Sequence, residues 1–207
     1  NWGRIWRITY EGTAPDRQRP QMYRDTPAQL VKHLEHQNGW WRDSAQKELV
    51  LRQNKSVVPA LVTMARTSSN QLAKMHALWT LEGLGALDAR LVREQMKHPD
   101  PKIRIQAIRA SETLYKAGDK SFANDYRAML KDADTDVVIQ AMLTINLRRI
   151  PQYAELIRAT KDATSVRGIT EFGDQLLRPQ TSSQGQRPSL ADGAVTGLNL
   201  STEERRI

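Results

Sequence analysis

The sequence predicts an all-α fold, a superhelix or solenoid of about four to five stacked helix pairs that follows a single β-strand. Three observations support this prediction. A capping residue, a cation and a small residue recur at fixed spacing through the middle of the chain. The hydrophobic periodicity is helical from about residue 26 onward. Only residues 4–10 alternate in the manner of a strand.

The strand is predicted within the stretch GRIWRITYEG, where Trp6, Ile8 and Tyr10 would point to one face. A single strand cannot satisfy its own backbone hydrogen bonds, so it needs a sheet to join. We therefore expect residues 4–10 to be the last strand of a sheet formed by upstream sequence. Because the chain opens at Asn1 without a starting methionine, we also expect it to be part of a longer polypeptide.

Three segments are predicted along the 207 residues. Residues 1–24 hold the strand and a polar connector, residues 25–177 hold the helical repeats, and residues 178–207 form a linker or tail rich in Gln, Ser, Pro and Gly. The repeat domain begins at Thr26-Pro27, because threonine can cap the free amides of a helix and proline needs no donor at the first position.

The repeat is aligned on four alanines, separated by 32, 30 and 34 residues, that we call the anchor alanines: Ala45, Ala77, Ala107 and Ala141. Seven residues before each lies a residue able to cap a helix: Asn38, Asn70, Asp100 and Asp134. Three residues before each lies a cation or, in the last unit, valine: Arg42, Lys74, Arg104 and Val138. We expect each cation to reach a capping carboxylate or amide in an adjacent unit, which would form a ladder along the repeats.

Short linkers divide each unit into two expected helices. The pairs are 40–53 with 56–66, 71–84 with 88–97, 101–117 with 121–131, and 135–148 with 151–161. A further helix at 164–177 is expected to begin a degraded terminal unit, with Thr170 at the anchor position and Ala163 at the cap position. Such units bury their apolar faces only by stacking on one another.

The stretch from Asp100 to Ala107, Asp-Pro-x-Ile-Arg-x-x-Ala, resembles an armadillo-like HEAT repeat. Three stretches in order, GRIWRITYEG, NGWWRDSAQKELVLRQ and MHALWTLEGLGALD, resemble the central part of bacterial membrane-bound or periplasmic dehydrogenases of the planctomycete and verrucomicrobial type. In those proteins a quinoprotein-like glucose/sorbosone dehydrogenase β-propeller is followed by HEAT repeats and then by a c-type cytochrome domain.

The resemblance implies that residues 4–10 close the last blade of an upstream propeller. The implied partners are that propeller and a downstream cytochrome domain, on the same or an associated chain, at a periplasmic location or on the periplasmic side of a membrane. The parent's PQQ-like quinone and haem c would lie outside this segment, which has no cysteine for a C-x-x-C-H haem site. We predict no catalytic residue, cofactor, metal or transmembrane span within the segment.

The net charge of +8 makes nucleic-acid binding an alternative. The charge is spread along the chain, since residues 25–180 hold 23 basic and 18 acidic residues. In a HEAT-like DNA glycosylase, Trp40 and Trp41 would grip the duplex while Asp43 aids base excision. The diffuse charge argues against nucleic acid as a partner. A general protein-binding solenoid is a third possibility.

The candidate interface residues are mostly aromatic: Trp6, Trp40, Trp41, Arg42, His76 and Trp79. Adjacent residues differ by about 100° around a helix, so Trp40 and Trp41 cannot enter the same groove. We expect one ring to pack inward and the other to cover the connector or a preceding domain. Asp43 is expected in the first helical turn, where it would interact favourably with the helix dipole.

His76 and Trp79 lie three residues apart and should share a face with Leu72 and Met75. They could contact a cofactor edge, but a buried imidazole satisfied by a carbonyl is the preferred interpretation. His33 and His36 could chelate a metal in the same spacing, although solvated positions are preferred because no third ligand is suitably spaced.

Three further features have a structural interpretation beside a functional one. The repeat cations could line a phosphate groove, but their equal offset favours the ladder. Glu82 could be a general base, although no partner is fixed by spacing. Gly83 and Gly85 are expected to end a helix and to permit a tight turn.

Overall fold

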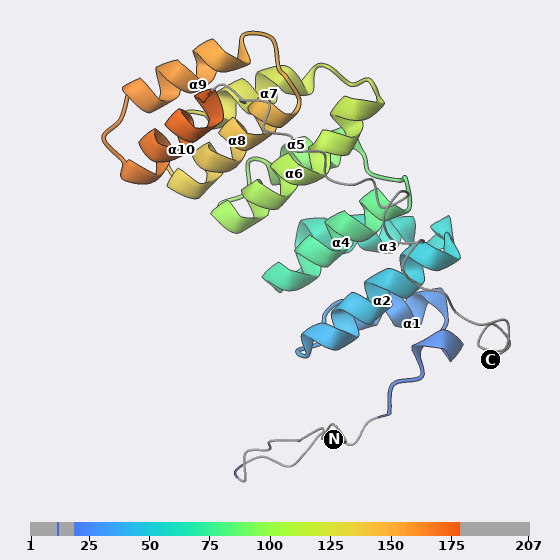
Figure 1. Cartoon of the computed structure of the whole chain (residues 1–207). Coiled ribbons are helices and arrows are strands. Elements are labelled where there is room, and N and C mark those ends of the chain that lie inside the picture. The colour runs from blue at the N-terminus through green and yellow to red at the C-terminus, as the bar shows by residue number, and fades with distance from the viewer. Residues whose placement is uncertain (1–11, 13–18, 179–207) are drawn as a thin grey trace, which may run out of the picture.

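The computed structural model describes residue 12 and residues 19–178, and all regular secondary structure within these residues is helical (Figure 1). The all-α prediction is confirmed for this part of the chain. The predicted strand at 4–10, the candidate Trp6 and residues 179–207 lie outside the described residues. No helix within the described part is long and apolar enough to cross a membrane.

The described residues form ten α-helices and two short 3-10 helices. The α-helices are α1 (Pro27–His33), α2 (Gly39–Arg52), α3 (Val58–Thr67), α4 (Gln71–Gly83), α5 (Ala89–Gln95), α6 (Pro101–Ala117), α7 (Phe122–Met129), α8 (Thr135–Leu147), α9 (Tyr153–Asp162) and α10 (Arg167–Leu177). The 3-10 helices are η1 (Met22–Arg24) and η2 (Lys55–Val57). The boundaries of α2 to α10 agree with those predicted to within three residues at each end.

The caps set most of these starts. Thr26 forms a capping box with Gln29 at the start of α1. The side chains of six other N-cap residues accept hydrogen bonds from backbone amides of the first turn: Asn38, Asn54, Asn70, Asp88, Asp100 and Asp134. Helices α3, α7 and α9 start without a side-chain cap, and among the even-numbered helices α10, which starts after Val166, does so too. This agrees with a terminal unit whose repeat pattern is degraded.

The helices pair differently from the expected units. Each even-numbered helix packs against the odd-numbered helix that precedes it, so that α3 pairs with α4 and α5 with α6. The predicted pairing of 40–53 with 56–66 is therefore wrong, because α3 packs against α4 rather than against α2. The later predicted pairs are displaced by one helix in the same direction. The repeat offsets are identical for both pairings, so they cannot distinguish which neighbour covers a helix.

The even-numbered helices form a row in which α2 contacts α4, α4 contacts α6, α6 contacts α8 and α8 contacts α10 (Figure 1). All four anchor alanines are fully buried in this row. A side chain of one carbon lets neighbouring helices approach closely, which explains why the small residue recurs. The odd-numbered helices form a second layer that packs mainly on the row rather than on itself.

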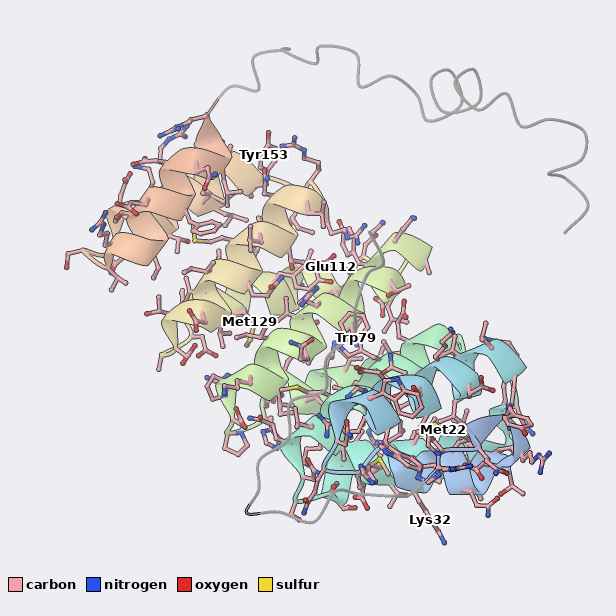
Figure 2. All side chains as sticks on the ribbon, turned by 60° about the horizontal axis from the view of Figure 1, so that its bottom comes forward. Met22, Lys32, Trp79, Glu112, Met129 and Tyr153 are labelled. Atoms are coloured by element: carbon pink, nitrogen blue, oxygen red, sulfur yellow. The ribbon has the colours of Figure 1, made fainter. Side chains whose placement is uncertain are left out.

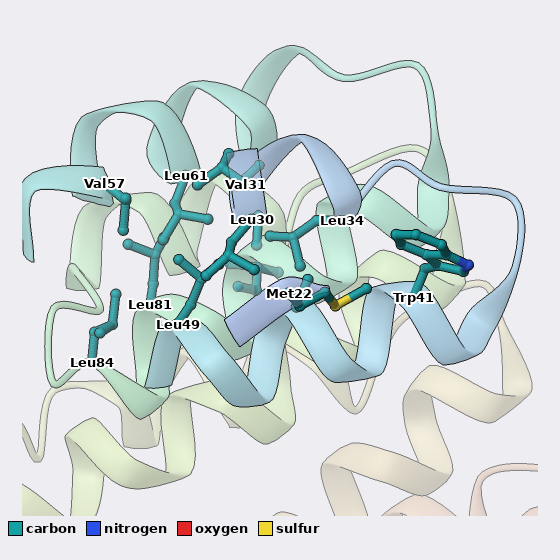
Figure 3. Packing of buried hydrophobic residues seen from close by; sticks show 14 of the residues in the cluster. Met22, Leu30, Val31, Leu34, Trp41, Leu49, Val57, Leu61, Leu81 and Leu84 are labelled. Carbon is teal, nitrogen blue, oxygen red and sulfur yellow. The ribbon is translucent and has the colours of Figure 1, made fainter. Parts of the chain in front are cut away.

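The hydrophobic core consists of two clusters. The first extends from Met22 to Leu91, and Figure 3 shows Leu30, Leu34 and Leu49 within it. The second extends from Val92 to Ile169. Full burial of one such aliphatic side chain stabilises the fold by about 1.5–3 kcal/mol.

Ser111 is the exception among the residues that follow the anchor alanines by four positions. The others are aliphatic and buried: Leu49, Leu81 and Ile145. Ser111 is also buried, and its hydroxyl lies 2.9 Å from the hydroxyl of Tyr126, a fully buried ring of α7. Burial raises the pKa of Tyr126, so its hydroxyl stays protonated and needs a hydrogen-bond partner. Ser111 supplies that partner.

Candidate interaction surface along the helix row

The tryptophan pair at the start of α2 is divided between the core and the surface. Trp41 is 8% exposed, and its ring stacks on His36 with 4.9 Å between centroids. Trp40 is 55% exposed and meets Trp41 edge-on at 6.1 Å. The two rings therefore do not form a stacking platform, and only Trp40 is available to a partner.

His33 and His36 are both partly exposed to solvent, and each ring also lies against Trp41. The Nε2 atom of His33 is 2.9 Å from a carboxylate oxygen of Asp25. His36 accepts a hydrogen bond from the amide of Asn38 at 3.0 Å. Within the described residues, no three His, Cys, Asp or Glu side chains lie close enough together to hold a metal ion.

The repeat cations bind backbone carbonyls that precede their own helix. Arg42 and Arg104 each donate to two carbonyls, six and five residues earlier, at 2.6–2.9 Å. Lys74 is buried and donates to the last turn of α3 at 2.8 and 3.3 Å. None of the three reaches the capping residue itself of an adjacent unit, so that part of the prediction is wrong. Arg104 does reach a carboxylate of the next unit, that of Asp132, two residues before the cap Asp134. The carbonyls that Lys74 reaches lie in the last turn of α3, where they lack intrahelical partners and favour a cation. Those that Arg42 and Arg104 reach lie in the turns between helices.

Other residues join consecutive units near the caps. The side-chain amide of Gln71 donates to the carboxylate of Asp100, and this bond holds the pKa of Asp100 below its usual value. Asn70 donates to the carbonyl of Glu35 at 3.3 Å. The caps therefore take part in contacts between units, but the partner is a glutamine or a carbonyl rather than a cation.

His76 lies between α2 and α4. Its Nδ1 atom is 2.7 Å from the side-chain oxygen of Gln46, and its Nε2 atom is 3.9 Å from Asp43. The pKa of His76 is lowered by burial, raised by Asp43 and lowered by Arg42, with a net downward shift. A glutamine side chain, not a backbone carbonyl, satisfies the ring.

Asp43 does not lie in the first turn of α2, where we expected it to interact with the helix dipole. Helix α2 begins at Gly39, so Asp43 is already in the second turn. Its side chain is 77% exposed and faces His76 instead.

Trp79 and Glu82 continue the interhelical contacts toward α6. The indole nitrogen of Trp79 donates to Gln106 at 3.0 Å, and the guanidinium of Arg109 lies 5.8 Å from the centre of the Trp79 ring. Glu82 accepts a hydrogen bond from Thr113 at 3.0 Å. Trp79, a possible cofactor contact, and Glu82, a possible general base, thus both hold α4 against α6.

The same kind of contact joins α6 to α8. Glu112 accepts from the hydroxyl of Thr144 at 2.6 Å and from Arg148 at 2.8 Å. Figure 2 shows Trp79 and Glu112 on the helix row. We call the side chains that join the row from α2 to α8 the polar line: Gln46, His76, Trp79, Glu82, Gln106, Glu112, Thr113 and Thr144.

Two glycines near the end of α4 have different roles. Gly85 has φ of +59°, the left-handed conformation expected for a tight turn. Gly83 is the last residue of α4, and a Cβ there would lie only 2.6 Å from a methyl carbon of Val50. Gly83 therefore lets α4 approach α2 closely, a role that the sequence did not indicate.

The sequence also gave no indication of a groove between the last two helix pairs. It has a volume of about 870 Å³ and is bounded by the end of α7, the start of α8, α9 and the start of α10. Val138, which breaks the series of repeat cations, is one of its lining residues. That break in the pattern was the only available sequence signal.

The candidate interface residues thus fall into separate groups. Trp40 is on the surface, Trp41 and Arg42 pack against α1 and its following turn, and His76 and Trp79 belong to the polar line. Comparison with known protein families and with curated protein sequences finds no match for this chain, so its function has to be inferred from these contacts.

Proposed function

We propose that this chain is a non-catalytic scaffold, a HEAT-like solenoid within a multidomain periplasmic dehydrogenase. It would join a sugar or alcohol dehydrogenase propeller to a c-type cytochrome and hold the two at a distance suited to electron transfer. The quinone and haem belong to those neighbouring domains. The proposal combines the sequence resemblance with the packing of the helix row.

The observation that carries the proposal is the polar line. Gln46 bonds His76, Trp79 bonds Gln106, and Glu112 bonds Thr144, so side chains link four successive even-numbered helices. These groups are used to fix one helix against the next. Such continuous cross-linking favours a stiff spacer, and intramolecular hydrogen bonds typically contribute about 0.5–1.5 kcal/mol each.

Trp40 is the best candidate for contact with a neighbouring domain. Its exposed ring lies at the N-terminal end of α2, and Leu72 of α4, at the same offset from its anchor alanine, is also 42% exposed. Exposed tryptophan is favoured at protein interfaces because one ring buries a large area with little loss of side-chain entropy.

A general protein-binding solenoid is the remaining alternative. The DNA glycosylase hypothesis has less support, because Trp41 is buried against His36 and Asp43 faces His76. Trp41 is therefore not free to grip a duplex beside Trp40. A duplex binder would also show an affinity that falls steeply with salt.

The first test is intact-mass measurement and N-terminal sequencing of the protein from its host. The proposal expects sequence upstream of Asn1 that forms a multi-stranded domain. A native chain that starts at Asn1, or upstream sequence without strands, would contradict it. Turnover of a sugar by this chain alone with added quinone would also contradict it.

The second test measures binding between this chain and the separately expressed upstream domain. Trp40→Ala should weaken binding by about tenfold or more if Trp40 is an interface anchor. Leu51→Ala is the matched control, because Leu51 is 67% exposed near the other end of the same helix. Equal effects of the two substitutions would remove Trp40 from the interface.

A further inference from the structure

Arginine–carboxylate ion pairs link successive odd-numbered helices. Arg66 of α3 pairs with Glu94 of α5 at 2.8 Å, and Arg93 of α5 pairs with Asp125 of α7 at 2.9 Å. Arg127 of α7 occupies the position of Arg93 in the next unit, since each lies fourteen residues before an anchor alanine. The pair of Arg93 with Asp125, repeated one unit later, would place a carboxylate of α9 opposite Arg127.

Helix α9 does not pair a carboxylate with Arg127 in this way, although Glu155 lies 28 residues after Arg127, the separation between Arg66 and Glu94. The residue 32 positions after Arg127, the separation between Arg93 and Asp125, is Ala159. The guanidinium of Arg127 bonds two uncharged oxygens instead, a side-chain amide oxygen and a backbone carbonyl, at 3.1 and 3.2 Å. Lys131 lies one turn further on, exposed at the same rim. Two cations therefore lie at a gap beside α9, and Asp132, which is paired with Arg104, lies there too.

The gap is the groove of about 870 Å³, which falls within the range of about 300–1,000 Å³ typical of ligand pockets. Its lining is mainly apolar and includes Val138, Leu156 and Ile169. In the three preceding units a long cation stands where Val138 stands, and it reaches toward the preceding turn. The short side chain of Val138 and the methyl group of Ala159 leave this space open.

We propose that the groove binds a small amphiphilic carboxylate, a molecule with one carboxylate group and an apolar chain. The carboxylate pairs with Arg127 and Lys131 and so gives Arg127 the charged partner that Arg66 and Arg93 have. The apolar chain lies along Leu156 and Ile169. Charge and apolar lining select this class together, because a cationic amphiphile meets two like charges and a short polar anion leaves the apolar wall uncovered. This site does not depend on the proposed scaffold function.

The test is calorimetric titration of the full chain with sodium dodecanoate below the concentration at which it forms micelles. Saturable binding with one site is expected, and dodecyltrimethylammonium of equal chain length should not bind. Arg127→Met, which keeps the aliphatic part and removes the charge, should weaken dodecanoate binding by about tenfold or more. Arg109→Met is the matched control, because Arg109 is an exposed arginine of α6 outside the groove.

Ala159→Glu provides an independent variant. The new carboxylate should pair with Arg127, as Asp125 pairs with Arg93, and should abolish dodecanoate binding without lowering the melting temperature. Ala60→Glu, a change at an exposed alanine of α3, should leave binding intact. Absence of saturable binding to the unaltered chain, equal binding of the cationic amphiphile, or unchanged binding in both groove variants would overturn the proposal.

Discussion

Arg104 and Asp132 form an ion pair with two hydrogen bonds, of 2.9 and 2.7 Å, between α6 and the turn that precedes α8. Their side chains are only 14% and 10% exposed. Asp132 also accepts from the amide of Asp134, the cap of α8. The pair therefore connects one repeat cation to the start of the next long helix.

Replacing Arg104 with methionine should lower the free energy of unfolding by about 2–4 kcal/mol, because Asp132 would remain largely buried without its partner. Urea denaturation at neutral pH measures the change. Arg90→Met is the control, since Arg90 is 87% exposed in its ion pair with Glu94 and should cost less than about 0.5 kcal/mol. Similar losses in the two variants would show that burial of the Arg104 pair is unimportant.

Asp132 should also contribute to the pH dependence of stability. Burial raises its pKa, but the hydrogen bonds from Arg104 and from the Asp134 amide lower it more, so the pKa lies below the ordinary value of 3.8. The unfolded chain then binds a proton more readily than the folded chain. This stabilisation is present above about pH 4 and is lost as the pH falls through the folded pKa. The unfolding free energy of Asp132→Asn should therefore fall less between about pH 6 and about pH 3 than that of the unaltered chain.

His76 should affect the stability of the fold at a higher pH than Asp132 does. Its pKa is lowered from 6.5, first by burial and also by Arg42, although Asp43 opposes the shift. The unfolded chain therefore takes up a proton before the folded chain, and stability should decline as the pH falls below about 6.5 until the folded pKa is passed. Nuclear magnetic resonance titration of the four histidines measures this directly, and Asp43→Asn should lower the His76 value further. A folded pKa at or above 6.5 would contradict the assignment.

The contact between Gly83 and Val50 predicts a specific pair of mutants. Gly83→Ala should destabilise the chain by about 1–3 kcal/mol, because the added methyl group would overlap Val50 and push α4 away from α2. Val50→Ala removes the obstructing methyl groups. The double mutant should therefore be more stable than the sum of the single effects predicts, in a urea-denaturation cycle. Simple additivity would mean that Gly83 does not set this helix distance.

The sequence predicted the local features of the fold well because short-range chemistry controls them. Asn70 and Asp134 cap helices through their own first-turn amides, and Thr26-Pro27 starts α1 in the same way. These interactions involve residues two or three positions apart, so they are visible in the pattern. The division of Trp40 and Trp41 between surface and core likewise follows from helical geometry.

Long-range features could not be obtained from the pattern. The repeat offsets were compatible with either pairing of neighbouring helices, and the length of Arg42 or Arg104 did not reveal which acceptor it would reach. Ser111 departs from the aliphatic pattern, and only its hydrogen bond with Tyr126, fifteen residues away, explains why. The groove depends on side chains that are short where other units have long ones, and its location depends on how α7 and α9 pack on α8.

The two hydrophobic clusters meet within α5, where Leu91 belongs to the first and Val92 to the second. Leu87, just before α5, packs against both. Because each helix touches only near neighbours in the chain, the two halves can open with different free energies, as stacked units do. Native-state hydrogen exchange should then show two groups of protected amides, divided at α5, and the less stable half would exchange without global unfolding.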